Sequence, residues 1–121
     1  MSFDKLTKEA RIAKGLTLRQ CCAELGVDPS NWSKMERGIV PPPRDPATLA
    51  SWAAFLGLDG VRRQEFFDLA ALARNELPAD LADDAVVMAA LPVFFRAVRG
   101  SELEGAKLQE FITDLRSLHQ P

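Results

Sequence analysis

Polar side chains of one kind gather in the segment GVDPSNWSKMERG, residues 26–38. On a helix that turns by about 100° per residue, Trp32, Met35 and Glu36 share one side. The opposite side carries only hydrogen-bond donors and positive charge: it consists of Ser30, Ser33, Lys34 and Arg37, with Asn31 at its flank. Such side chains donate hydrogen bonds to phosphate oxygens and base edges. The spacing therefore predicts a short helix with one face on a core and the other on nucleic acid.

A merely solvated helix face has the same composition. Charged and hydroxyl side chains line the outer face of most surface helices, where they contact only water. Taken alone, the segment favours this second interpretation. The surrounding elements and motifs decide between the two.

Catalytic chemistry finds no support in the sequence. The single histidine is His119, and the two cysteines, Cys21 and Cys22, are adjacent. They provide neither a zinc-ligand set nor a nucleophile with its base, and no glycine-rich phosphate loop is present. We expect no enzymatic activity, no metal and no cofactor. The cysteines are expected to be packed thiols in a reducing compartment, with a reactive thiol as the alternative.

The distribution of charge is consistent with binding to a polyanion, and the hydropathy of the chain does not indicate a membrane-spanning segment. Residues 1–46 contain eight Lys or Arg and six Asp or Glu, whereas residues 47–121 contain seven and eleven. A basic N-terminal segment followed by an acidic remainder is consistent with nucleic-acid binding by the N-terminal segment. The apolar run 85–95 is too short to cross a membrane, and the charged start MSFDKLTKEAR lacks the apolar region of a signal peptide. We expect a cytoplasmic protein.

Helical periodicity recurs along the chain and strand alternation does not, so the sequence predicts an all-α fold. Three short helices are expected over residues 3–14, 18–25 and 29–37, and Gly15, Gly26 and Gly38 end them. Thr17 and Asp28 are N-cap residues for the second and third helices, and Pro29 suits the first helical position. Two short helices joined by a glycine turn have the arrangement of a helix-turn-helix.

Prolines and caps divide the rest of the chain. The run IVPPPRDP, 39–46, is expected to be extended, because a residue that precedes proline disfavours the helical conformation. Two further helices should follow, from the cap Asp45 to Gly57 and over residues 61–75. Residues 76–84 are expected to form a linker or loop.

The last part of the chain should contain three more helices. We expect a short helix before Pro92 and another from Pro92 to Arg99, since proline ends or kinks a helix. Ser101 and Glu104 have the spacing of a capping box, which starts a last helix. Its apolar positions are Leu108, Phe111, Ile112 and Leu115.

Two sequence motifs in the N-terminal part resemble those of a known protein family. The stretch EARIAKGLTLRQCCAELGVDPSNWSKMERG contains R-x-x-K-G-L-T and L-G-V-x-x-S-x-x-S-K-x-E-R-G. It resembles the helix-turn-helix of the Xre/Cro family of transcriptional regulators, and the likeness covers residues 3–58. The resemblance implies a five-helix lambda-repressor-like DNA-binding domain, here followed by a helical C-terminal extension. With these motifs around it, the polar face of 29–37 is expected to bind DNA.

The resemblance implies a role for each candidate contact residue. The helix 29–37 would enter the major groove, where Ser30, Asn31 and Lys34 would reach base edges. Arg44 would lie near the backbone or the minor groove. Phosphate contacts would come from Thr17, Arg19, Ser33 and Arg37.

Other positions are expected to be structural. Arg11 and Glu36 resemble the internal ion pair between the first and third helices of the family, and Trp32 belongs to the core. Two positions depart from the family pattern. Leu18 stands where relatives carry a phosphate-binding glutamine, and Pro29 replaces a residue that reads a base in some relatives. Sequence readout is therefore expected to rest on fewer side chains.

The chain is thus expected to have a DNA-binding domain at residues 1–75 and a helical extension at 76–121 for dimerisation or partner binding. L-P-x-F-x-R-x-x-R-G at 91–100 resembles tails of some phage-type and stress-response regulators of this family. The leading hypothesis is a repressor that binds double-stranded DNA as a homodimer on an inverted repeat. The alternatives are an antitoxin that binds a small toxin and a regulator whose tail is cut by a protease. The apolar tail could also simply complete one core.

Overall fold

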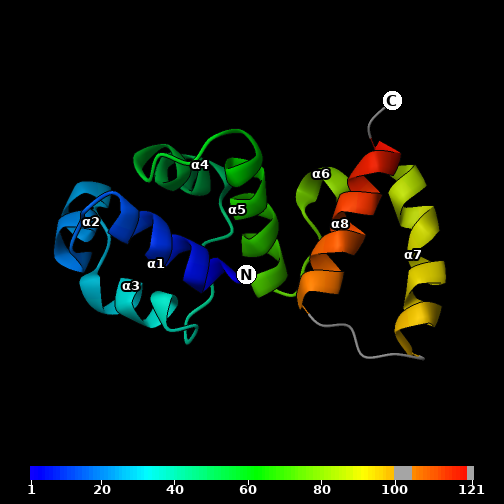
Figure 1. Ribbon diagram of the computed structural model, residues 1–121, viewed down its shortest axis with the longest axis horizontal. Coiled ribbons are helices and arrows are strands. Elements are labelled where there is room, and N and C mark those ends of the chain that lie inside the picture. Colours follow the sequence, from blue (N-terminus) through cyan, green and yellow to red (C-terminus); the bar gives the residue numbers. More distant parts are fainter. Residues whose placement is uncertain (100–104, 120–121) are drawn as a thin grey trace. The chain divides into compact units, whose positions relative to one another are not determined.

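The computed structural model describes the backbone of residues 1–99 and 105–119, and the side chains there except those of 97–99, 105–109, 111 and 119. Within these residues the chain forms eight helices and no strand (Figure 1). The all-α prediction is confirmed. The helices are α1 (Phe3–Ala13), α2 (Leu18–Leu25), α3 (Pro29–Glu36), α4 (Pro46–Phe55), α5 (Gly60–Ala73), α6 (Ala79–Ala82), α7 (Ala85–Arg99) and α8 (Gly105–His119).

The predicted helix boundaries of the first half follow from local chemistry. Thr17 and Gln20 form a capping box at the start of α2, and the Asp28 carboxylate accepts a hydrogen bond from the Asn31 N–H at the start of α3. Asp45 caps α4 in the same way. Gly26 ends α2 at φ 68°, a left-handed conformation that is costly for a residue with a Cβ atom. The short turn between α2 and α3 depends on this glycine.

The residues divide into two compact units, one of Ser2–Glu76 and one that begins at Leu77. In the first unit, α1 packs on α3 and α5, and α2 packs on α3. Two aromatic pairs lie in its core: Phe3 and Phe66, with ring centroids 4.9 Å apart, and Trp32 and Trp52, 4.8 Å apart. Pairs of this kind add stabilisation beyond the area that they bury. The core thus ties α3 to α4 and α1 to α5.

The second unit is a small helical assembly with its own core. In it α7 packs on α8, and α6 contacts both. An ion pair joins Arg116 of α8 to Asp80 of α6. Among the side chains that the structure describes in this unit, the buried apolar ones include Leu81, Val87, Leu91, Ile112 and Leu115.

Two predictions about this second unit are wrong. Residues 76–84, expected as a linker or loop, contain the short helix α6, which the buried side chain of Leu81 anchors. Pro92 does not separate two helices but lies inside α7. The expected capping box at Ser101 and Glu104 and the side chains of Leu108 and Phe111 lie outside the described residues.

Packing explains why α7 continues through its proline. Proline in a helix interior costs about 3 kcal/mol, because it lacks the N–H and its ring crowds the preceding turn. Val87 and Leu91 are buried on one face before the proline, and Phe94 is half-buried after it. Burial of each large apolar side chain contributes roughly 1.5–3 kcal/mol. Keeping all three on one helix face outweighs the cost of Pro92.

Candidate nucleic-acid interface

Helix α3 turns its apolar side inward. Trp32 and Met35 are 2% and 4% exposed, and Trp32 packs against Trp52 of α4. Because these two residues face the core, the opposite side of α3 faces outward. Ser30, Asn31, Lys34 and Arg37 are exposed there, and Ser33 is half-buried.

A buried ion pair fixes α3 to α1. The Arg11 guanidinium donates to both carboxylate oxygens of Glu36, through Nε at 2.7 Å and Nη2 at 2.9 Å. Its Nη1 donates to the Leu16 carbonyl at 2.8 Å, so Arg11 also holds the turn after α1. Trp32 Nε1 donates to the same carboxylate. The predicted internal ion pair is thus present, with the indole as a third donor.

This arrangement has an electrostatic consequence for the outer face. Hydrogen bonding to Glu36 raises the pKa of Arg11, against the effect of burial. Glu36 is the only acid between Pro29 and Arg37, and its side chain is 6% exposed. Its negative charge is therefore turned away from the exposed face and matched by Arg11. The outer face of α3 keeps only donors and cations.

Helix α2 packs on α3 and adds polar groups at its own amino end. The Thr17 hydroxyl accepts from the Gln20 N–H at 3.1 Å, and the Gln20 side-chain oxygen accepts from the Thr17 N–H at 2.9 Å. The first N–H groups of a helix lack partners within that helix and suit an anion. Arg19 is exposed in this first turn. Leu18, in contrast, packs on the core, which accounts for an apolar residue at this position.

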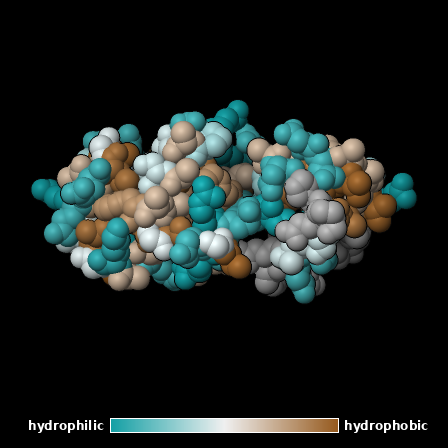
Figure 2. Space-filling view, turned by 90° about the horizontal axis from the view of Figure 1, so that it is seen from above, coloured by the Kyte–Doolittle hydropathy of each residue, from teal (hydrophilic) through white to brown (hydrophobic). Residues whose placement is uncertain are grey.

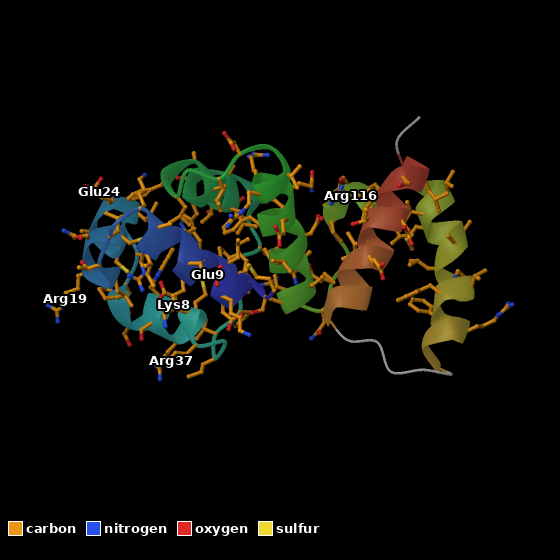
Figure 3. All side chains as sticks on the ribbon, viewed as in Figure 1. Lys8, Glu9, Arg19, Glu24, Arg37 and Arg116 are labelled. Atoms are coloured by element: carbon orange, nitrogen blue, oxygen red, sulfur yellow. The ribbon has the colours of Figure 1, made fainter. Side chains whose placement is uncertain are left out.

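The three predicted base-reading side chains are not engaged elsewhere. Among the described residues, no hydrogen bond or ion pair involves the side chains of Ser30, Asn31 or Lys34. Arg37 donates from Nε to the Ser33 carbonyl at 3.3 Å. Figure 3 shows Arg19 on α2 and Arg37 at the end of α3, both directed away from the body of their unit. Five of the eight predicted contact residues therefore lie within the packed helices α2 and α3, and Thr17 and Arg37 are cap residues at the ends of these helices.

Arg44 is placed differently. It lies in the extended segment between α3 and α4, and its side chain is 69% exposed. Its guanidinium forms an ion pair with Glu76, beyond the end of α5. Sequence reasoning missed this partner, which is 32 positions away and belongs to no motif. The Glu76 carboxylate therefore offsets the positive charge of Arg44, and the surface around Arg44 is less positive than the sequence suggests.

The two cysteines are packed thiols, as predicted. Cys21 and Cys22 are free and fully buried in the core of the first unit. Burial raises the pKa of Cys21 to about 11 and also raises the pKa of Cys22. Both thiols are therefore protonated at neutral pH and are poor nucleophiles.

The described part of the chain has neither a cluster of metal-ligating side chains nor a membrane-spanning helix. No group of three or more His, Cys, Asp or Glu residues is arranged there to hold a metal ion. No helix in that part combines the length and apolar character needed to cross a bilayer.

The comparison with protein families matches residues 8–66 to the model of a helix-turn-helix domain. The matched range contains α2, α3 and all eight predicted contact residues. No significant match was found among curated proteins or among solved structures. The chain therefore contains a helix-turn-helix domain in its N-terminal part with further helices after it, and this domain suggests DNA binding.

Proposed function

We propose that this chain is a sequence-specific DNA-binding transcriptional regulator of the Xre/Cro family type, a repressor that acts as a dimer on an inverted-repeat operator in the cytoplasm. One observation carries the proposal. The outer face of α3 presents exposed donors and cations without an acid, and the Arg11–Glu36 pair and the Trp32–Trp52 contact hold that helix in place. The helix-turn-helix match over residues 8–66, which contains α3, favours DNA contact over a merely solvated face.

The contact roles follow from position and chemistry. With α3 in the major groove, Lys34 suits the acceptors of guanine, and Asn31 suits the paired donor and acceptor of adenine. Ser30, in the first turn of α3, would reach an adjacent base. Phosphates would be held by Thr17 and Arg19 at the amino end of α2 and by Ser33 and Arg37 on α3, with Arg44 near the minor groove. The protein would repress by occupying a promoter, and helix-turn-helix domains are typically not enzymes.

We propose that the protein dimerises through its helical extension, residues 76–121, which contains the second unit from Leu77 onwards. Helix α7 has no polar residue between Ala85 and Phe95. Its buried face uses Val87 and Leu91, yet Val86, Met88, Val93 and Phe95 are 46–66% exposed. Apolar residues reach the surface of this unit in Figure 2. A helix that is apolar on all sides normally needs a partner to cover it, and paired half-sites increase affinity and specificity.

The base-reading assignment can be tested without knowing the operator. Duplexes that bind the full-length protein would be selected from a random pool, and their affinity measured for wild type and variants at fixed salt. Lys34→Ala should weaken binding to the selected duplex about 5- to 150-fold, from about 1–3 kcal/mol per base contact. Ser30→Ala should weaken it less. Lys5 is an exposed lysine on α1, so the variant Lys5→Ala is a control for the loss of one positive charge.

Contradiction would come from two results. If Lys34→Ala and Ser30→Ala leave the affinity for the selected duplex unchanged, the assigned face is wrong. If the selection recovers no preferred sequence, the protein is not a sequence-specific regulator.

The acidic second half supports one other candidate function, that of an antitoxin. Residues 47–121 contain eleven acidic and seven basic side chains, which suits a basic protein partner such as a small toxin. The antitoxin would also repress its own operon through α3. A small reading frame beside the gene whose product co-purifies with residues 76–121 would favour this function. Absence of such a neighbour would favour the plain regulator.

A further inference from the structure

The segment that carries Arg44 is tied to the end of α5 at two points. Arg74 donates from Nη1 to the Pro42 carbonyl at 2.8 Å, and Pro42 is buried. Two residues further along the segment, Arg44 pairs with Glu76. All four residues belong to the first unit. The path of the chain after α3 is thus set by residues that follow α5.

One carboxylate oxygen in this cluster faces two guanidinium groups. Glu76 Oε1 pairs with Arg44 Nη2 and lies 3.9 Å from Arg74 Nε. In the described part of the chain, Arg74 Nε is buried and has no hydrogen-bond partner. A buried N–H without an acceptor is unfavourable, so Arg74 offers Glu76 a second place to bind.

We infer that Glu76 is an internal competitor for DNA phosphate at Arg44. The inference rests on the proposed DNA binding and on Arg44 as one of its contacts. When the domain meets DNA, Arg44 exchanges the Glu76 carboxylate for a phosphate, and the carboxylate shifts towards Arg74 Nε. The exchange costs little, because an exposed ion pair contributes little to stability and the released carboxylate gains a buried donor.

Two consequences distinguish this arrangement from a passive surface pair. Glu76 limits DNA affinity without touching DNA, so removing its charge should strengthen binding. The effect must also depend on Arg44, because Arg44 is the group for which carboxylate and phosphate compete. A general loss of negative charge near DNA would strengthen binding regardless of residue 44.

A double-mutant cycle on the full-length protein tests the inference. The probe is a duplex selected from a random pool by the wild-type protein, and affinity is measured over a range of salt concentrations. The variants are Glu76→Gln, Arg44→Ala and the two combined. Glu65→Gln, on α5, removes one acid elsewhere as a control. Circular dichroism verifies that each variant is folded.

Glu76→Gln should bind about two- to fivefold more tightly than wild type at low salt, the range of an exposed ion pair. In the Arg44→Ala background the same change should have no more effect than Glu65→Gln. Arg44→Ala should make the negative slope of log affinity against log salt shallower by about 0.9, the value for one phosphate contact.

Several results would overturn the inference. Weaker or unchanged binding by Glu76→Gln would show that Glu76 positions Arg44 or does nothing. An equal gain in both backgrounds would show a general charge effect. If Arg44→Ala leaves binding unchanged while Lys34→Ala weakens it, the inference fails and the proposed function stands. If the wild-type selection yields no bound duplex, the proposed function itself fails.

Discussion

Glu36 is the residue on which the orientation of α3 depends most. It accepts hydrogen bonds from Arg11 at two positions and from the Trp32 indole, all at a nearly buried carboxylate. Removing one partner of a buried pair leaves the other charge without compensation. Glu36→Ala should therefore lower the free energy of unfolding by about 3–5 kcal/mol, measured by urea denaturation.

The control for Glu36 is an acid of the same type that lies on the surface. Glu24 on α2 is exposed, so Glu24→Ala should change the free energy of unfolding by less than about 0.5 kcal/mol. Equal effects of the two substitutions would contradict the structural role of the Arg11–Glu36 pair.

Cys21 makes stability depend on pH in the alkaline range. Its pKa is raised from 9.0 to about 11 in the folded protein, so the unfolded chain releases the thiol proton first as pH rises. This contribution to stability is therefore fully present below pH 9 and is lost between pH 9 and 11. Urea denaturation of wild type and Cys21→Ala across this range should show a steeper decline for wild type. Parallel declines would mean that the thiol is not protected by burial.

Much of the site was predictable residue by residue, because the motifs place side chains within one or two adjacent helices. The buried Trp32, the Arg11–Glu36 pair and the packed cysteines were all anticipated. The Arg44–Glu76 pair was not. It joins an extended segment to the residues after α5, and only the packing of the whole unit brings these together.

Among the elements, the N-caps offer a matched comparison within one chain. Asp28 and Asp59 both precede a helix, but only Asp28 accepts a hydrogen bond from a backbone N–H of its helix. Asp28→Ala should lower the free energy of unfolding by about 1 kcal/mol, whereas Asp59→Ala should have little effect. Thermal and urea denaturation would measure both. A larger loss for Asp59→Ala would contradict the cap assignment.

The N-cap of α4, Asp45, makes the stability of the fold depend on pH in the acidic range. The Thr48 hydroxyl and the backbone N–H groups of Ala47 and Thr48 donate to Asp45, and these bonds lower the pKa of its carboxyl. A lowered folded-state pKa gives stability that is present above the ordinary pKa and is lost as pH falls. Caps of this kind were predictable because they depend on residues that are close in sequence.

The continuation of α7 through Pro92 was less predictable, because it depends on packing between residues that are distant in sequence. Proline signals a helix boundary locally, but the buried side chains of Val87 and Leu91 and the half-buried Phe94 belong to a core shared with α6 and α8. Sequence alone does not show which helices will meet there. The same shared core turns part of the expected linker into α6, through Leu81.

For the whole molecule, the division into two units after Glu76 predicts that residues 1–76 fold alone and that the second unit is responsible for dimerisation. A chain of residues 1–76 keeps the core of the first unit and the Arg44–Glu76 pair, so it should fold. It should be a monomer by light scattering, because it lacks the exposed apolar side chains of α7. The full chain should be a dimer at the same concentration. A monomeric full chain, or a dimeric 1–76 fragment, would contradict dimerisation through the second unit.

The central claim is that the full chain recognises a specific DNA sequence as a dimer. The most direct test is footprinting on DNA upstream of the gene for this protein at two salt concentrations, with a non-specific duplex as control. Contacts to phosphates weaken as salt rises, whereas base contacts preserve discrimination between sequences. We predict protection of a short inverted repeat that persists at the higher salt. Absence of protection at both salt concentrations, or equal binding to the control duplex, would contradict the account.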